Sequence, residues 1–395
     1  TLALDALQEL LLVAHDAADR SAFGAWLVVA RGKLRRLEGE PRTRARLLHL
    51  EGLAALREGE PARAVEAFET AAELWREQGP GATLELARTL LQLGVARGRQ
   101  GEDAGAEEAF EAARALAEGE GLLPLLAETH QERGRLHLDR GRLPPAEQQL
   151  RRALELRVAI DGPTAPITIP TRVPLAMLLQ QRGELPAAIA MAQAARDSLG
   201  PGVPAQSHAQ VMSLLARFHR QQGDWNAALA DYQRVEEALA ASPSPDPLEQ
   251  AMLDSNVADC LRIMGRTDAA RTRYERALEG LRIHAAADDQ RHVYPLYGLG
   301  SLLAAQHDRQ GAAAVLRRAL AIQEKAPKDL DMGAIVRWEL GHAVLDDAAA
   351  DPSERREAQG LVRAARDQFQ AFGDTAMVAE IDGFLSHCGP RCATP

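Results

Sequence analysis

Residues 52–71 read GLAALREGEPARAVEAFETA, and residues 94–113 read GVARGRQGEDAGAEEAFEAA. In both stretches a glycine is followed seven positions later by a second glycine, and then by alanine, phenylalanine and alanine at steps of five, four and three. The same spacing, with similar residues, recurs in seven consecutive units, and an eighth unit begins after them. The small residues that open the eight units are Gly52, Gly94, Gly134, Ala176, Ala216, Ala258, Gly300 and Gly341. Such a repeat predicts a stack of similar supersecondary units.

Each unit has the features of two consecutive helices. Six of the seven complete units have glycine at the second position, as at Gly59, and the seventh has His307. Glycine there predicts the end of a first helix, because it adopts the left-handed C-cap conformation at little cost. The following alanine–aromatic–alanine pattern lies on one face of a second helix. The small residue that opens the unit predicts a close crossing between the two helices.

The composition agrees with an all-helical protein and narrows the classes of partner. Hydrophobic residues make up 46% of the 395 residues but aromatic residues only 4%, which suits close helix packing better than sheets. The net charge of −10 argues against a nucleic-acid partner, which calls for a basic surface. No apolar run reaches the ~18–20 residues of a membrane span. Three cysteines make no disulfide framework, so we expect a cytoplasmic protein.

The order small residue, glycine turn, alanine, aromatic, alanine resembles the tetratricopeptide repeat. The resemblance covers about residues 45–372, although the units recur every 40–42 residues rather than every ~34. This longer period is similar to that of the kinesin-light-chain subtype and of the repeat regions fused to bacterial serine/threonine protein kinases. The resemblance implies an all-α, right-handed superhelical α-solenoid of about eight helix pairs with capping helices.

Three regions are expected from this register. Residues 1–44 predict a divergent N-terminal helical pair, 45–372 the solenoid, and 373–395 a C-terminal capping helix followed by a tail. We expect Asp374 to cap the final helix. The tail contains Cys388 and Cys392, for which disorder is favoured over a disulfide or a metal site. Pro170 and Pro174 predict a delayed start of the first helix of the fourth unit.

No stretch of the sequence matches a catalytic or cofactor motif. Phosphate-binding loops, zinc-protease helices, nucleophile elbows and kinase signatures are all missing from the sequence. We therefore expect no enzyme, no metal and no cofactor. The scattered histidines, such as His137 and His219, are interpreted as packing residues.

The resemblance implies that a partner binds on the concave side, which the first helices line. Arg217, Arg220 and Arg262 would form a patch for carboxylates or phosphates. Asn256 stands where kinesin-light-chain-like repeats place an asparagine that bonds a peptide backbone. The complete set of predicted peptide-binding residues is Gln131, Arg135, Arg217, Arg220, Asn256, Arg262, Tyr294, Tyr297 and Trp338, the last three as aromatic anchors.

The alternative is that these side chains pair with neighbouring acids, for example Asp259 with Arg262 or Arg217. The leading functional hypothesis is a protein–protein interaction scaffold that binds an acidic protein or peptide segment. In this hypothesis the chain is the recognition module of a larger bacterial signalling protein. The second hypothesis is a ligand-gated regulator that senses a small peptide or metabolite in the same groove. An enzyme built on the helical scaffold is a third.

Overall fold

The computed structural model describes residues 40–242, 245–325 and 330–387. Most of the expected N-terminal pair and the tail with Cys388 and Cys392 lie outside the described residues. The chain divides into two compact units, which are described separately: unit 1 extends to Leu214, and unit 2 begins at Leu215. All regular structure in the described ranges is helical, which confirms the predicted all-α class.

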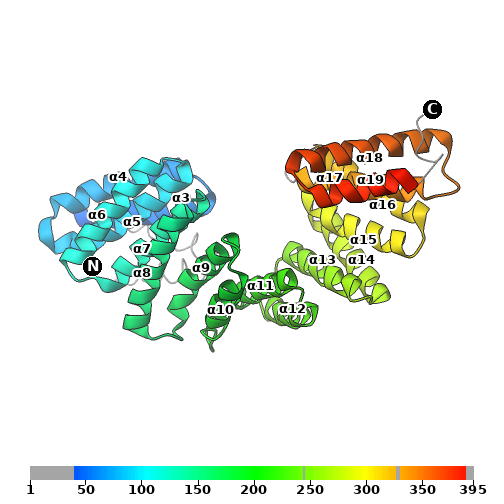
Figure 1. The fold of residues 1–395 in the computed structure, drawn as a ribbon. Coiled ribbons are helices and arrows are strands. Elements are labelled where there is room, and N and C mark those ends of the chain that lie inside the picture. The colour runs from blue at the N-terminus through cyan, green and yellow to red at the C-terminus, as the bar shows by residue number, and fades with distance from the viewer. Residues whose placement is uncertain (1–39, 243–244, 326–329, 388–395) are drawn as a thin grey trace. The chain divides into compact units, whose positions relative to one another are not determined.

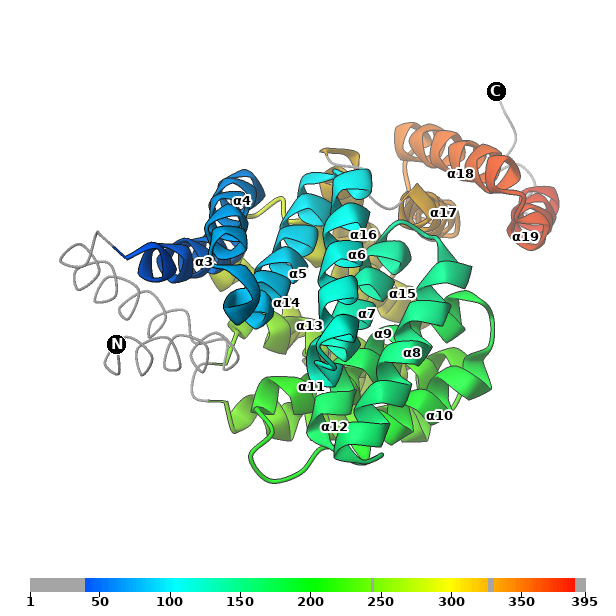
Figure 2. The same ribbon diagram turned by 90° about the vertical axis from the view of Figure 1, so that its left-hand side faces the viewer.

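Unit 1 consists of four helix pairs and the start of a fifth (Figures 1 and 2). The second helices α4, α6 and α8 also contact the first helix of the following pair, and the first helices α3, α5, α7 and α9 contact one another in turn. The first helices therefore line one face, which we call the first-helix face. The elements of unit 1 are α3 (Pro41–Glu58), α4 (Pro61–Glu77), η1 (Gly79–Ala82), α5 (Thr83–Gln100), α6 (Asp103–Gly119), α7 (Leu123–Asp139), α8 (Leu143–Asp161), η2 (Pro166–Thr168), α9 (Ile169–Gln181), α10 (Leu185–Arg196) and the first part of α11 (Ala205–Gln222).

Unit 2 repeats this arrangement from the second part of α11 onward. Its last helix, α19, begins after Asp374, whose carboxylate accepts a hydrogen bond from the backbone N–H of Met377. The elements of unit 2 are α12 (Trp225–Ala240), α13 (Pro247–Ile263), α14 (Thr267–His284), η3 (Gln290–His292), α15 (Val293–Ala305), α16 (Arg309–Lys325), α17 (Leu330–Leu345), α18 (Pro352–Phe372) and α19 (Thr375–His387).

The predicted turn positions have the left-handed backbone conformation. Gly59, which follows α3, has φ 79°, and Gly101, which follows α5, has φ 90°. The glycines at the same position of the next four repeats also have positive φ; they are Gly141, Gly183, Gly223 and Gly265. His307 has φ 64°. Among the described residues, it is the one residue other than glycine with a positive φ. The turn geometry is thus a property of the position in the repeat, and the seventh unit forms it without glycine.

The small residue at the start of each sequence repeat, such as Gly94, lies where the two helices of the pair cross. A Cβ atom at Gly94 would lie 2.7 Å from the ring of Phe110, and one at Gly52 would lie 2.6 Å from Phe68. Both rings are fully buried. Only a residue without a side chain permits this approach, so the predicted close crossing is confirmed.

Helix α9 starts late, as its prolines predict. It begins seven residues before Ala176, whereas α7 begins eleven residues before Gly134. The short helix η2 precedes it, with Pro170 in its first turn and Pro174 inside it. The late start leaves an irregular segment between α8 and α9.

Replacing His307 by glycine should stabilise unit 2. A left-handed conformation costs a residue with a Cβ atom about 1 kcal/mol, which glycine avoids. We expect His307→Gly to raise the free energy of unfolding by about 0.5–1 kcal/mol in urea titrations. Gln306→Gly is the matched control, since Gln306 has φ −84° and should lose stability. If both substitutions changed the free energy of unfolding by the same amount, the left-handed conformation of His307 would not be the cause.

Replacing Gly94 by leucine should destabilise unit 1. The added side chain would overlap the Phe110 ring, and overpacking of a core typically costs about 1–3 kcal/mol. Gly119→Leu is the control, because nothing lies within 4 Å of a Cβ atom built there. Urea unfolding of the two variants checks the prediction, and equal stability would show that the register is wrong.

Candidate functional site

The first-helix face of unit 1 contains a groove of about 990 Å³. It is bordered by α7, α9 and the first part of α11, which belong to three successive pairs, and by the irregular segments before α9 and α11. The side chains that line it are those of Glu128, Gln131, Arg135, Leu138, Asp139, Arg157, Pro166, Ile167, Ile169, Pro170, Val173, Pro174, Met177, Pro201, Val203, Pro204, Ser207 and Gln210. Apolar groups and prolines from α9 and the two segments predominate, and the charged groups come mainly from α7 and α8.

The groove has an apolar surface that is open to solvent. Ile167, in the segment before α9, is 43% exposed. Along α9 the groove is lined by Val173, which is buried, and by Met177, which is half-buried. Exposed apolar area of this kind is more common at binding surfaces than on the rest of a protein surface.

Arg157 supplies a positive charge to the groove. It lies on α8, its Nε is shielded from solvent, and that nitrogen has no hydrogen-bond partner among the described residues. A nitrogen that water cannot touch is also out of reach of a ligand, so a ligand carboxylate would pair with the Nη groups of Arg157, which have no partner among the described residues. Sequence reasoning missed Arg157 because it considered only first-helix positions.

Pro174 leaves one carbonyl group of α9, that of Pro170, without its usual helical donor. Proline has no N–H, so it cannot donate to the carbonyl group of Pro170 one turn earlier in α9. Both prolines line the groove. A peptide N–H could therefore bond to this part of α9.

Arg172 holds the segment before α9 in place. Its guanidinium, which is 6% exposed, donates to Thr168 Oγ1 at 2.9 Å and to Ser198 Oγ at 2.6 Å. It also donates to the backbone carbonyl of Pro163. Desolvation by burial lowers the pKa of Arg172. Arg172 thus fixes the loop that carries Ile167.

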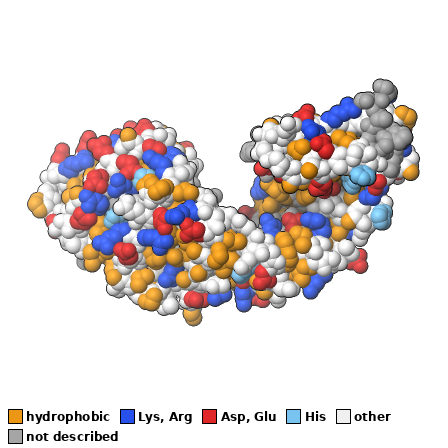
Figure 3. Space-filling view, viewed as in Figure 1, with side chains coloured by type: hydrophobic (Ala, Val, Ile, Leu, Met, Phe, Trp, Pro, Cys, Tyr) orange, Lys and Arg blue, Asp and Glu red, His pale blue; other side chains and the backbone are white. Residues whose placement is uncertain are grey.

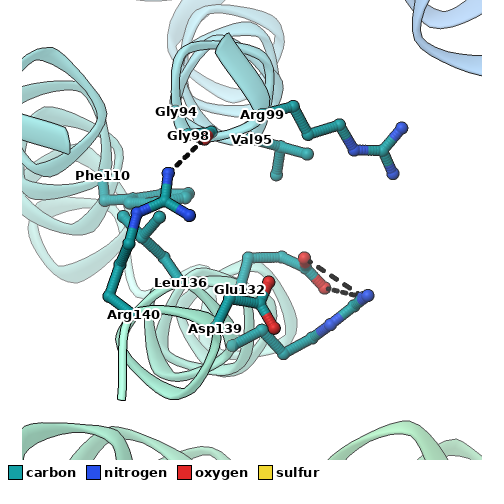
Figure 4. Close-up of a pocket in the computed structure, with 10 residues that line it drawn as sticks. Gly94, Val95, Gly98, Arg99, Phe110, Glu132, Leu136, Asp139 and Arg140 are labelled. Atoms are coloured by element: carbon teal, nitrogen blue, oxygen red, sulfur yellow. Dashed lines mark hydrogen bonds and ion pairs between the residues drawn. The ribbon is translucent and has the colours of Figure 1, made fainter. Parts of the chain in front are cut away.

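A smaller hollow of about 150 Å³ lies between α5, α6 and α7 (Figure 4). Arg140 closes one side by donating to the carbonyl of Gly98 at 2.8 Å. Arg135 and Asp139 line both this hollow and the larger groove. The face turned to the viewer in Figure 3 shows basic and acidic side chains interspersed over unit 1, with hydrophobic groups between them.

Both predicted residues of unit 1 line the groove, but both also have partners in the chain. Gln131 is 7% exposed, and its Oε1 accepts a hydrogen bond from Thr171 Oγ1 at 2.7 Å. Arg135 lies 3.3 Å from Glu132 Oε1, and half of its side chain is exposed. Gln131 thus mainly joins α7 to α9, whereas Arg135 is accessible to a ligand.

In unit 2, Arg220 and Arg262 lie on either side of Asp259. Arg220 Nη1 lies 3.5 Å from Asp259 Oδ2 and donates to Asn256 Oδ1 at 3.2 Å. Arg262 Nε donates to Tyr274 Oη at 3.4 Å, and that hydroxyl donates to Asp259 Oδ1 at 2.6 Å. The expected pairing of an arginine with Asp259 therefore occurs, but through Arg220.

The other predicted residues of unit 2 differ in how far they are exposed. Arg217 is exposed, with its guanidinium 5.8 Å from the centre of the Phe218 ring. Tyr294 is 42% exposed, and Tyr297 is half-buried, which raises its pKa to about 12. These positions leave Arg217 and Tyr294 accessible.

Trp338 requires a correction, because it is not an exposed anchor. It is 6% exposed, stacks on His342 at 5.2 Å and meets Phe384 of α19 edge-on at 5.3 Å. The last helix covers it. The spacing of the repeats placed Trp338 correctly on a first helix, but it could not show which element packs against that helix.

Cys260 is a free, buried cysteine on α13. Burial raises the pKa of the Cys260 thiol to about 11, so it remains protonated and unreactive at neutral pH. No group of three His, Cys, Asp or Glu side chains in the described ranges could hold a metal ion. Within these ranges, no helix is both long and apolar enough to cross a membrane.

Comparison with known families agrees with the geometry. Residues 207–283 and 249–325 match the model of the tetratricopeptide repeat. Residues 207–325 thus consist of tetratricopeptide repeats. No curated protein matches it. Among solved structures it is similar to the apo form of RapI, with 13% identity, a TM-score of 0.62, and coverage of 85% of this chain and 95% of that one.

Two further solved structures match parts of the chain. The first is a signal-transduction ATPase with a tetratricopeptide-repeat sensor from Pyrococcus horikoshii, with 12% identity, a TM-score of 0.54, and coverage of 82% of this chain and 50% of that one. The second contains kinesin-light-chain repeats from Podosopora anserina, with 16% identity, a TM-score of 0.44, and coverage of 52% and 98%. At these identities the likeness concerns the fold alone.

Glu339, on α17, leads to a prediction about pH. Burial raises the pKa of its carboxyl group, so the folded state holds this proton more tightly than the unfolded state. Its contribution to stability is present at low pH and is lost as the pH rises through the folded-state pKa. Glu339→Gln should therefore raise the melting temperature at pH 7, by roughly 2–4 °C.

The same comparison at pH 4 should show no such gain, because the wild-type carboxyl is then protonated in the folded state. Glu357→Gln is the control: Glu357 is exposed on α18, and its replacement should leave the melting temperature unchanged. A stabilisation by Glu339→Gln that is independent of pH would exclude the desolvation explanation.

Proposed function

We propose that this tetratricopeptide-repeat protein is an interaction scaffold that binds an extended peptide segment of a partner in the unit 1 groove. The groove between α7, α9 and α11 is the observation that carries the proposal. It combines exposed apolar area at Ile167 with the positive charge of Arg157, which lines the groove. These are the two features by which peptide sites commonly gain affinity and orientation.

The chemistry of the groove suggests the kind of peptide that binds. Apolar side chains would pack on Ile167, Val173 and Met177, and a carboxylate would pair with Arg157 and Arg135. A backbone N–H of the peptide would donate to the carbonyl of Pro170. The partner is therefore a segment that combines apolar and acidic residues.

We further propose that the chain acts as the recognition module of a larger bacterial signalling protein. The similarity in fold to a signal-transduction ATPase with a repeat sensor supports this, since the alignment covers half of that longer protein. A module of this kind binds the partner and leaves any chemistry to an attached domain.

A ligand-gated regulator is the second candidate. The groove volume of about 990 Å³ is at the upper end of the range of small-ligand sites, ~300–1,000 Å³. A small peptide or metabolite could fill it. A change in the radius of gyration on ligand addition, measured by small-angle scattering, would favour this regulator over a static scaffold.

A display library of random twelve-residue peptides, selected on the purified protein, tests the scaffold proposal. We expect enriched sequences with apolar and acidic residues, and we expect Arg157→Glu to weaken their binding at least tenfold through repulsion of the carboxylate. Fluorescence anisotropy with synthetic peptides measures the change. Arg152→Glu is the control, because Arg152 lies on the same helix and is exposed. A library without enriched peptides, or equal binding by both variants, would count against the groove.

A further inference from the structure

Five prolines from two separate segments of the chain line the groove of unit 1. Pro166 lies in η2, and Pro170 and Pro174 are four residues apart in α9, so the latter two share one side of that helix. We call these three the first proline wall. Pro201 and Pro204 lie between α10 and α11, and we call them the second proline wall. Both walls border the same cavity of about 990 Å³.

The rings of these prolines are accessible from solvent. Pro166, Pro170, Pro201 and Pro204 are exposed, and Pro174 is half-buried. The start of a helix accounts for Pro170, because a proline in the first turn costs no hydrogen bond. It does not account for Pro174, which stands inside α9 and costs the helix a hydrogen bond. Helix formation alone therefore does not explain the proline surface of the groove.

A buried arginine joins the two segments that carry the walls. Arg172 Nη1 donates to Thr168 Oγ1, beside the first wall, at 2.9 Å, and to Ser198 Oγ, in the segment of the second wall, at 2.6 Å. The two hydroxyl oxygens lie 3.2 Å apart. All three residues are buried, so water does not compete for these bonds. The network thus fixes the two segments relative to each other before a ligand binds.

A surface of proline rings favours a flat and rigid ligand group. A proline side chain has no rotamer freedom to lose, so a ligand that packs on it does not have to order it. The C–H groups beside the proline nitrogen carry a partial positive charge, whereas the face of an aromatic ring is negative. Contact between the two rings therefore adds attraction beyond the apolar area that it buries.

The described residues that line the groove include no aromatic side chain. Their apolar members are proline, isoleucine, valine, leucine and methionine. Proline-rich peptides bind in grooves that are lined with aromatic side chains. Here the protein presents the prolines, so the complementary aromatic ring has to come from the ligand.

The charges of the groove add a second requirement. Arg157 lies on α8, lines the groove and has Nη groups without a partner among the described residues. Both carboxylates of the groove, those of Glu128 and Asp139, lie on α7. A ligand carboxylate is therefore best accommodated at Arg157.

We propose that the two proline walls form a slot for an aromatic side chain of the bound peptide, and that this peptide carries an acidic residue near it for Arg157. The slot selects phenylalanine, tyrosine or tryptophan over leucine and isoleucine. This inference rests on the proposed scaffold function and names the kind of residue that the unit 1 groove selects.

Peptides from the random twelve-residue library test the slot. We expect the enriched sequences to share an aromatic residue close to an acidic one. In synthetic peptides this residue is replaced by phenylalanine and then by cyclohexylalanine, which keeps the size and apolar character of phenylalanine but has no aromatic face. The second change should weaken binding about threefold to tenfold in fluorescence anisotropy. Equal binding of the two peptides would reject the slot.

Alanine variants of the walls provide the second test. Pro170→Ala and Pro201→Ala remove one ring from each wall, and each should weaken the phenylalanine peptide about threefold. Pro186→Ala is the matched control, because Pro186 is the second residue of α10, as Pro170 is of α9, and is exposed outside the groove. It should leave binding unchanged.

A double-mutant cycle separates contact with the ring from a general loss of structure. In the variant that combines Pro170→Ala with Pro201→Ala, the difference in affinity between the phenylalanine and cyclohexylalanine peptides should shrink, because the partners of the aromatic face are gone. Loosening of the groove would weaken both peptides equally and leave this difference as it is in the wild type. The second result would overturn the proposal.

Failure of the slot and failure of the scaffold function can be told apart. If the enriched peptides lose binding with Arg157→Glu but bind equally well with cyclohexylalanine, the slot is wrong and the scaffold function stands. If no peptide is enriched, the scaffold function fails, and saturation-transfer NMR with N-acetyl-phenylalanine amide and N-acetyl-cyclohexylalanine amide decides on the slot. Transfer to the aromatic amide alone, lost in the double alanine variant, supports it. Equal transfer to both amides rejects it.

Discussion

The structure depends on the close crossing of two helices at a residue with little or no side chain. Gly94 on Phe110 is the clearest case, and Gly52 on Phe68 repeats it. The second helix can then bury its aromatic residue completely against the backbone of the first. Because every unit is built on such a contact, the pair is the element that repeats, and each pair contacts mainly its neighbours. The first helices, which contact one another, are thereby placed on a common face.

The groove of unit 1 arises where this regularity is interrupted. Proline delays the start of α9, and the segment before it is held by Arg172 instead of by helical hydrogen bonds. An apolar residue, Ile167, is thus left exposed beside a regular first-helix face. A strictly regular array would present helix surfaces without this side wall. The irregularity that shortens α9 therefore also gives the groove its depth.

The polar residues of the first helices are of two kinds, those with hydrogen-bond or ion-pair partners in the described chain and those without an ion pair there. Arg220, Asn256 and Asp259 satisfy one another, so much of the predicted arginine patch is bonded within the chain. Arg262 and Glu339 are partly buried and have no ion-pair partners in the described ranges.

The sequence by itself determined the helix pairs, their order and the residues at their crossings. These features follow from local rules: the left-handed turn at Gly59, the apolar stripe of each second helix, and the lack of a side chain at Gly94. The same register placed Arg262 and Tyr297 on first helices. It could not show that Phe384 covers Trp338, that Thr171 occupies Gln131, or that Arg157 reaches the groove from a second helix. Only the tertiary structure decided these points, because burial and pairing depend on groups that are distant in the chain, whereas helix position depends on near neighbours.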